Sequence, residues 1–148
     1  MDTPKPPGFD RQILAVLAGV LVFIILGPVA GSNIFGLLTL FVFAYLMGAI
    51  PAAVAGLIFS LVTLWLFKSN KLESVGIWLR VGAFRGGLTG LLTAFIFFLC
   101  IYINDSHFTF ESAIGSSVFF GLCGVLGGAA SGHFAEKAMK KIYFSISK

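Results

Sequence analysis

Residues 48–56 read GAIPAAVAG and residues 124–132 read GVLGGAASG, and each stretch lies inside a long apolar run. Both place small residues four positions apart, which aligns them along one face of a helix. In a bilayer such bare faces let two helices approach closely, because large apolar side chains gain little there over contact with lipid. The two stretches therefore predict helix-packing faces in a membrane bundle. The expected packing residues are Gly48, Ala52 and Gly56 in the first stretch and Gly124, Gly128 and Gly132 in the second.

The composition is that of an integral membrane protein. The chain has 148 residues, enough for one domain, with 58% apolar and only 11% charged residues. A soluble fold of this length has too little interior to bury so much apolar surface. The net charge of +4 does not indicate a nucleic-acid partner, because the basic residues cluster between the apolar runs. Cys100 and Cys123 lie within those runs, where thiols act as small apolar groups rather than as disulfide partners.

The apolar runs predict an all-α membrane protein with four transmembrane helices, near residues 13–31, 40–64, 81–103 and 112–134. Each run approaches or exceeds the ~20 residues that cross the ~30 Å hydrocarbon core of a bilayer. The first run has a basic lead and ends near Ala30, Gly31 and Ser32, so it could instead be a cleaved signal peptide. Its apolar length favours a retained helix. The second run contains Pro51, and we expect a bend just before it.

The distribution of charge predicts the orientation. All ten Lys and Arg residues fall on one side of the four-span map, whereas Asp105 and Glu111 fall on the other. By the positive-inside bias we expect the tails 1–12 and 135–148 to be cytoplasmic. Four Gly-rich spans with every basic residue on the inner side are typical of small proteins of the bacterial inner membrane, where we expect the chain to lie. We expect a short surface helix near residues 71–79. An apolar stripe in the C-terminal tail predicts that this tail also lies on the membrane.

In each of the two stretches the small residues recur every four positions, and we call such a row a ladder. The two ladders also raise the question of an internal duplication. Residues 47–56 (MGAIPAAVAG) align without gaps with residues 123–132 (CGVLGGAASG), and each stretch belongs to the second helix of a predicted hairpin. Two hairpins of equal topology would be related by an axis along the membrane normal. The alternative is that Gly- and Ala-rich spans resemble one another by composition.

The third predicted span has a ladder of its own. We expect the second, third and fourth helices to pack through these faces, because steps of four residues match the crossing of helices that meet through small residues. The third ladder consists of Gly82, Gly86 and Gly90.

Candidate chemical groups are few. Asp105, His107 and Glu111 form an acid–histidine cluster in the predicted outer loop, which could ligate a metal or take part in acid–base chemistry. A solvated turn with helix caps is the alternative. The spacing fits no strong metal signature, so we predict no metal site and no cofactor. His133 and Glu136 lie at the inner end of the fourth span, where we expect a structural role.

Two arginines are the best candidates for contact with a ligand. Arg80 and Arg85 lie at the start of the third span, where a long side chain can reach lipid phosphate. Anchoring of the topology is the simpler role, and Arg85 could also face a neighbouring helix. The predicted spans contain no Asp or Glu. This argues against a proton-coupled exporter, but not against a pore or an uncoupled flippase.

These patterns indicate a non-enzymatic function. We expect a small accessory, assembly or immunity-type protein that binds another membrane protein, or a second copy of itself, through its helix faces. The lipid bilayer is the other expected partner. The alternative is a small transporter, channel or lipid flippase built as an oligomer. A membrane enzyme that uses Asp105, His107 or Glu111 ranks third.

Overall fold

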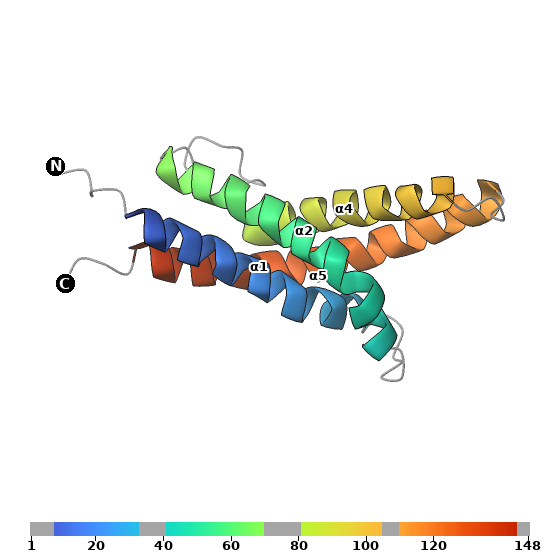
Figure 1. Cartoon of the computed structure of the whole chain (residues 1–148), viewed down its shortest axis with the longest axis horizontal. Helices are drawn as coiled ribbons and strands as arrows, with labels where there is room; N and C mark the ends of the chain where they lie inside the picture. The colour runs from blue at the N-terminus through green and yellow to red at the C-terminus, as the bar shows by residue number, and fades with distance from the viewer. Residues whose placement is uncertain (1–7, 33–40, 70–80, 105–109, 145–148) are drawn as a thin grey trace.

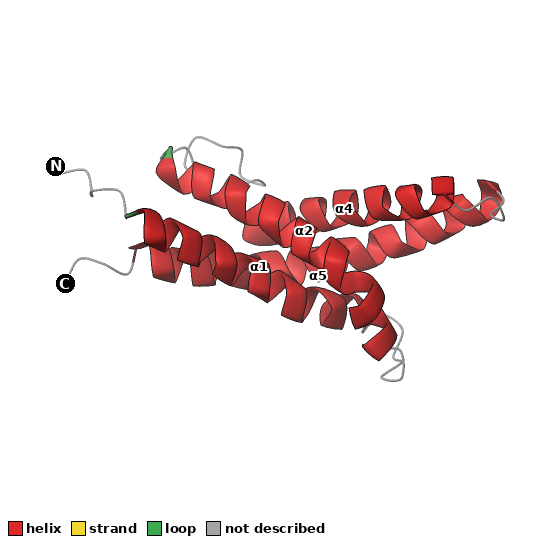
Figure 2. Cartoon of the chain, in the orientation of Figure 1, coloured by secondary structure: helices red, strands yellow, loops and turns green. Residues whose placement is uncertain are grey.

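The computed structural model is a bundle of helices and describes residues 8–32, 41–69, 81–104 and 110–144 (Figure 1). The four helices in these segments are all long and apolar enough to cross a membrane. The predicted fold class, an all-α bundle of four membrane-spanning helices, is therefore confirmed. Helices make up nearly all of the described residues (Figure 2). They are α1 (Phe9–Ser32), α2 (Phe41–Lys68), α4 (Gly82–Asn104) and α5 (Phe110–Phe144).

Several predictions fall outside the described residues. The surface helix expected near residues 71–79 and the side chain of Arg80 precede α4, and Asp105 and His107 lie between α4 and α5. Glu111 belongs to the first turn of α5. The predictions for these residues stay predictions.

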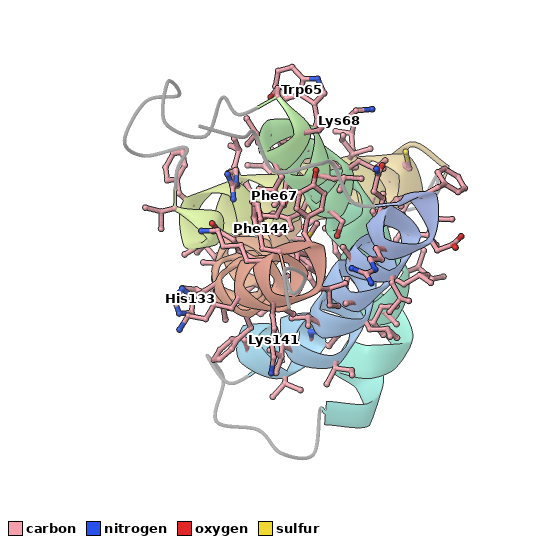
Figure 3. All side chains as sticks on the ribbon, turned by 90° about the vertical axis from the view of Figure 1, so that its left-hand side faces the viewer. Trp65, Phe67, Lys68, His133, Lys141 and Phe144 are labelled. Atoms are coloured by element: carbon pink, nitrogen blue, oxygen red, sulfur yellow. The ribbon has the colours of Figure 1, made fainter. Side chains whose placement is uncertain are left out.

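Helices that are neighbours in the sequence form antiparallel pairs, α1 with α2 and α4 with α5 (Figure 1). α5 joins the two pairs, because it packs along α4 and also along α1. The start of α1, the end of α2 and the end of α5 lie at one end of the bundle. We call this the basic end, since Arg11, Lys68 and Lys141 belong to it, and Figure 3 looks onto it.

Two helices contain a proline, Pro28 in α1 and Pro51 in α2. A proline inside a helix removes one backbone hydrogen bond and crowds the preceding turn, so the helix continues with a bend. In Figure 1, α2 changes direction in its first half, where Pro51 lies. Gly48 of α2 packs beside Pro28, with 3.7 Å between an ideal Cβ on the glycine and the proline ring.

The C-terminal part of α5 differs from the prediction. The sequence predicted a span that ends near residue 134 and a tail on the membrane surface, but α5 continues to Phe144 and its last turns belong to the core. Ala135, Met139 and Tyr143 are buried at intervals of four residues. The ring of Tyr143 lies 5.5 Å from the ring of Phe67 near the end of α2, measured between centroids. The apolar stripe therefore packs against protein rather than against lipid.

The apolar core lies between α1, α2 and α5. Phe23 of α1 and Phe59 of α2 are buried, and their ring centroids are 5.2 Å apart. Gly56 makes room for this pair, because a Cβ added to it would lie 2.7 Å from the Cβ of Phe23. Ala52 contacts Gly27, with 3.4 Å between its Cβ and an ideal glycine Cβ. The ladder of α2 thus faces α1, whereas the sequence predicted contact with the third and fourth helices.

The ladders of α4 and α5 meet each other backbone to backbone. An ideal Cβ on Gly86 would overlap the carbonyl oxygen of Gly128 and lie 2.7 Å from the Cα of Gly132. An ideal Cβ on Gly90 would overlap the carbonyl oxygen of Gly124 in the same way. No residue larger than glycine fits at these positions unless the two helices separate.

Replacing Gly128 with Leu is expected to force α4 and α5 apart and to lower the free energy of unfolding by about 3 kcal/mol, the upper range for an overpacked interior. Thermal unfolding of the purified chain in a mild detergent measures this loss. The matched control is Gly115→Leu, because an ideal Cβ on Gly115 meets no atom within 4 Å. Equal thermal stability of Gly128→Leu and the parent would show that the contact is incidental.

Candidate functional site

Two oppositely charged side chains are buried inside the bundle. Arg85, in the first turn of α4, is 4% exposed, and Glu136, in α5, is 8% exposed. The Nη2 atom of Arg85 lies 3.3 Å from the Oε2 atom of Glu136. Charges so well shielded from water are tolerated only beside a partner of opposite sign. An ionisable pair inside a membrane bundle is by default a candidate functional site.

The glycines of the α4–α5 interface position this pair. An ideal Cβ on Gly82 would overlap the Oε2 atom of Glu136 and would lie 2.9 Å from the Glu136 Cβ. It would also lie 2.8 Å from the carbonyl oxygen of Gly132. A side chain at position 82 would therefore occupy the space through which the carboxylate reaches Arg85. The first turn of α4 thus supplies both the space for the carboxylate and its counter-charge.

A second cation binds the same carboxylate. The Nζ atom of Lys140 lies 2.8 Å from the Oε1 atom of Glu136, one turn further along α5, and the Lys140 side chain is 46% exposed. Each carboxylate oxygen therefore faces one cation, with Arg85 buried and Lys140 half-exposed. We call these three residues the charged cluster. With two cations and one anion, the cluster carries one excess positive charge.

Aromatic contacts link the charged cluster to the other two helices. The Cζ atom of Arg85 lies 5.7 Å from the centroid of the Phe59 ring in α2, within the range of a cation–π interaction. Phe59 packs in turn against Phe23 of α1. A continuous path of contacts therefore runs from Glu136 of α5 through α4 and α2 to α1.

The charged cluster lies well inside the basic end of the bundle. At 1.5 Å per residue, Glu136 is about 12 Å from the end of α5 at Phe144. By the same measure, Phe59 is about 13 Å from the end of α2 at Lys68. Arg85 lies in the first turn of α4, but the neighbouring helices α2 and α5 continue beyond this point, so Arg85 and Glu136 are enclosed by helices.

α2 and α5 also bury three hydroxyl groups. Ser60, Thr63 and Ser131 are fully buried, and among the described residues their oxygen atoms have no hydrogen-bond partner. In α4, by contrast, the Thr93 hydroxyl donates to the carbonyl oxygen of Thr89 at 2.7 Å. A bond of this kind satisfies a hydroxyl within its own helix. Two of these hydroxyl groups face glycines of α1. The Ser60 oxygen lies against Gly19, and the Ser131 oxygen is 3.7 Å from an ideal Cβ on Gly27.

The residues singled out in the sequence lie in different settings. Arg85 lies among helices rather than at lipid phosphate, because the carboxylate of Glu136 offers it a partner inside the protein. His133 is on the exposed side of α5, where its ring contacts that of Phe134 at 5.5 Å between centroids. Among the described segments, no three His, Cys, Asp or Glu residues are placed to hold a metal ion.

Sequence reasoning missed the role of Glu136. Its neighbours Lys137, Lys140 and Lys141 resemble a membrane-surface tail, so we assigned Glu136 to the inner end of the span. The signal that could have found it is its spacing. Glu136 is four residues beyond Gly132 and therefore continues the ladder of Gly124, Gly128 and Gly132 along the same side of α5.

The chemistry of the charged cluster is ion pairing. Its carboxylate already contacts two cations, and the adjoining side chain of Phe59 is apolar. Comparison of the chain with protein-family models, with curated proteins and with solved structures finds no match. The interpretation of the site therefore rests on its own geometry.

Glu136→Gln is expected to lower the free energy of unfolding by about 3 to 5 kcal/mol, because it leaves Arg85 buried without a counter-charge. Unfolding in detergent measures the loss. The double variant Arg85→Met, Glu136→Leu removes both charges and should recover most of the stability. Lys140→Ala is the matched control and should stay within about 1 kcal/mol of the parent, since Lys140 is itself half-exposed and Arg85 still pairs with Glu136. Equal losses in the single and double variants would contradict this account.

Proposed function

We propose that the chain is a non-enzymatic accessory protein that binds another membrane helix through its outer surface. The observation that supports this is that the small-residue faces are already occupied within the chain: α4 meets α5, and the ladder of α2 meets α1. The buried charges likewise pair with one another. Recognition of a partner is then left to the apolar side chains that face outward.

We propose the outward face of α1 for such recognition. Its side chains lie at intervals of three and four residues, which places them in one seam along the helix. A seam of this spacing suits a partner helix that packs side by side at a small crossing angle. The opposite faces of α1 are occupied by α2 and α5. We call the seam the α1 seam; it consists of Leu14, Leu17, Leu21 and Ile25, each more than half exposed.

A photoreactive amino acid at Leu21, activated in intact cells, tests the proposal. We expect a discrete adduct with one membrane protein, or with a second copy of the chain, because Leu21 lies in the middle of the α1 seam. Ile96 of α4, 58% exposed, is the matched control and should label lipid. If neither Leu17 nor Leu21 gives a protein adduct, the proposal is wrong.

A transporter or lipid flippase is the second candidate. It is favoured by the charged cluster and by the unpartnered hydroxyls, because polar groups inside a membrane bundle commonly line the path of a substrate. The two candidates differ in the access of water to the interior. Labelling of a Ser131→Cys variant by a water-soluble maleimide, with Cys100 and Cys123 replaced by Ala, would favour the transporter, and protection would favour the accessory protein.

A further inference from the structure

An apolar groove lies between α4 and α5 on the outer side of the bundle. Its volume is about 460 Å³, which falls in the range of pockets that hold small apolar ligands. Nearly all of its lining is carbon. Its lining includes Phe84, Gly87, Leu88 and Leu91 of α4 and Val125 and Ala129 of α5.

The groove has a floor of small residues and a rim of large ones. An ideal Cβ on Gly87 would lie 3.6 Å from the Cβ of Ala129 and 3.4 Å from the carbonyl oxygen of Val125, so the floor is closed. Phe84 and Leu88 stand beside it and are exposed. The groove is therefore open along its length to the surrounding hydrocarbon but not to the interior of the bundle.

Basic residues stand where the groove ends. His133 and Lys137 follow Ala129 at successive intervals of four along α5, in the direction of the basic end. Residues with this spacing share one side of a helix, so both lie beyond the groove on the same side. Both are exposed, and Figure 3 shows His133 projecting outward from α5. Lys140 of the charged cluster, which is half-exposed, is three residues beyond Lys137 on α5.

We propose that this groove binds an anionic phospholipid, with one acyl chain on the floor at Gly87 and Ala129 and the phosphate at His133 and Lys137. The groove and the ligand present their groups in the same order. The apolar groove is followed by the basic residues His133 and Lys137, and the acyl chain of a phospholipid is followed by its phosphate. Basic pockets between membrane helices are a known mode of binding anionic headgroups. This inference does not depend on the proposed accessory function.

A helix is a poorer occupant of the groove than a lipid. A helix laid along Gly87 and Ala129 would continue past His133 and Lys137 and would shield these two groups from water and headgroups. Shielding a cation in this way is costly unless an anion accompanies it. A phospholipid brings its own anion to the basic residues at the end of the groove. Charge complementarity therefore favours the lipid.

Native mass spectrometry of the full chain, purified in detergent, can compare the retention of added phosphatidylglycerol and phosphatidylcholine with identical acyl chains. We expect the parent to retain phosphatidylglycerol preferentially. Lys137→Ala should weaken that retention about fivefold, the effect of one cation near a membrane surface. Lys68→Ala removes an exposed cation from the same end of the bundle but from α2, which does not line the groove, and as the matched control it should leave retention unchanged.

A second variant tests the apolar part of the site. Ala129→Phe fills the floor and should reduce retention of both lipids, whereas Gly115→Phe adds the same ring where an ideal Cβ meets no atom and should not. Equal retention of the two lipids by the parent, or equal effects of Lys137→Ala and Lys68→Ala, would overturn the proposal. Full retention by a folded Ala129→Phe variant would also overturn it. The proposal would also be overturned if the parent shows no preference between the two lipids and forms a dimer that Ala129→Phe dissociates. A second copy of the chain would then be the occupant of the groove.

Discussion

α4 and α5 touch backbone to backbone, and this contact sets the positions of the other groups in the bundle. It exists because three glycines on each helix carry no side chain toward the other helix. The short separation lets Arg85 reach Glu136 across the interface, and the guanidinium then lies beside Phe59 of α2. Phe59 packs in turn on Phe23 of α1. A side chain at Gly82 would overlap the carboxylate of Glu136, and a side chain at Gly86 or Gly90 would force apart the two helices that carry the ion pair.

The glycine contact and the ion pair contribute differently to specificity. A ladder that repeats every four residues looks the same after a shift of about 6 Å along the helix. The glycines alone therefore allow more than one register of α4 on α5. The pairing of Arg85 with Glu136 is possible in only one register, because a shift would leave two buried charges without partners at a cost of several kcal/mol each. The glycines permit the close approach, and the charges select the register.

The spans could be predicted from the sequence because length and hydropathy decide whether a helix can cross a bilayer. The extension of α5 could not, since the stripe of Ala135 and Met139 has the same pattern whether it faces lipid or protein. The neighbours that decide between them lie on other helices, with Gly19 of α1 beside Met139 and Phe67 of α2 beside Tyr143. The burial of Arg85 could not be predicted for a similar reason, because its partner, Glu136, lies on another helix. The sequence also does not decide which small-residue faces pack against each other, because any one of these faces can pack against any other.

A cysteine pair tests the close approach of α4 and α5 most directly. The ideal Cβ position on Gly87 lies 3.6 Å from the Cβ of Ala129, a separation that a disulfide spans without strain. In a chain with Cys100 and Cys123 replaced by Ala, the variant Gly87→Cys, Ala129→Cys should form an intramolecular disulfide on mild oxidation, identified by mass spectrometry of the linked peptides. The variant Gly87→Cys, Gly115→Cys should not. A folded protein in which the first pair stays reduced, or links no more readily than the second, would contradict the contact on which this account rests.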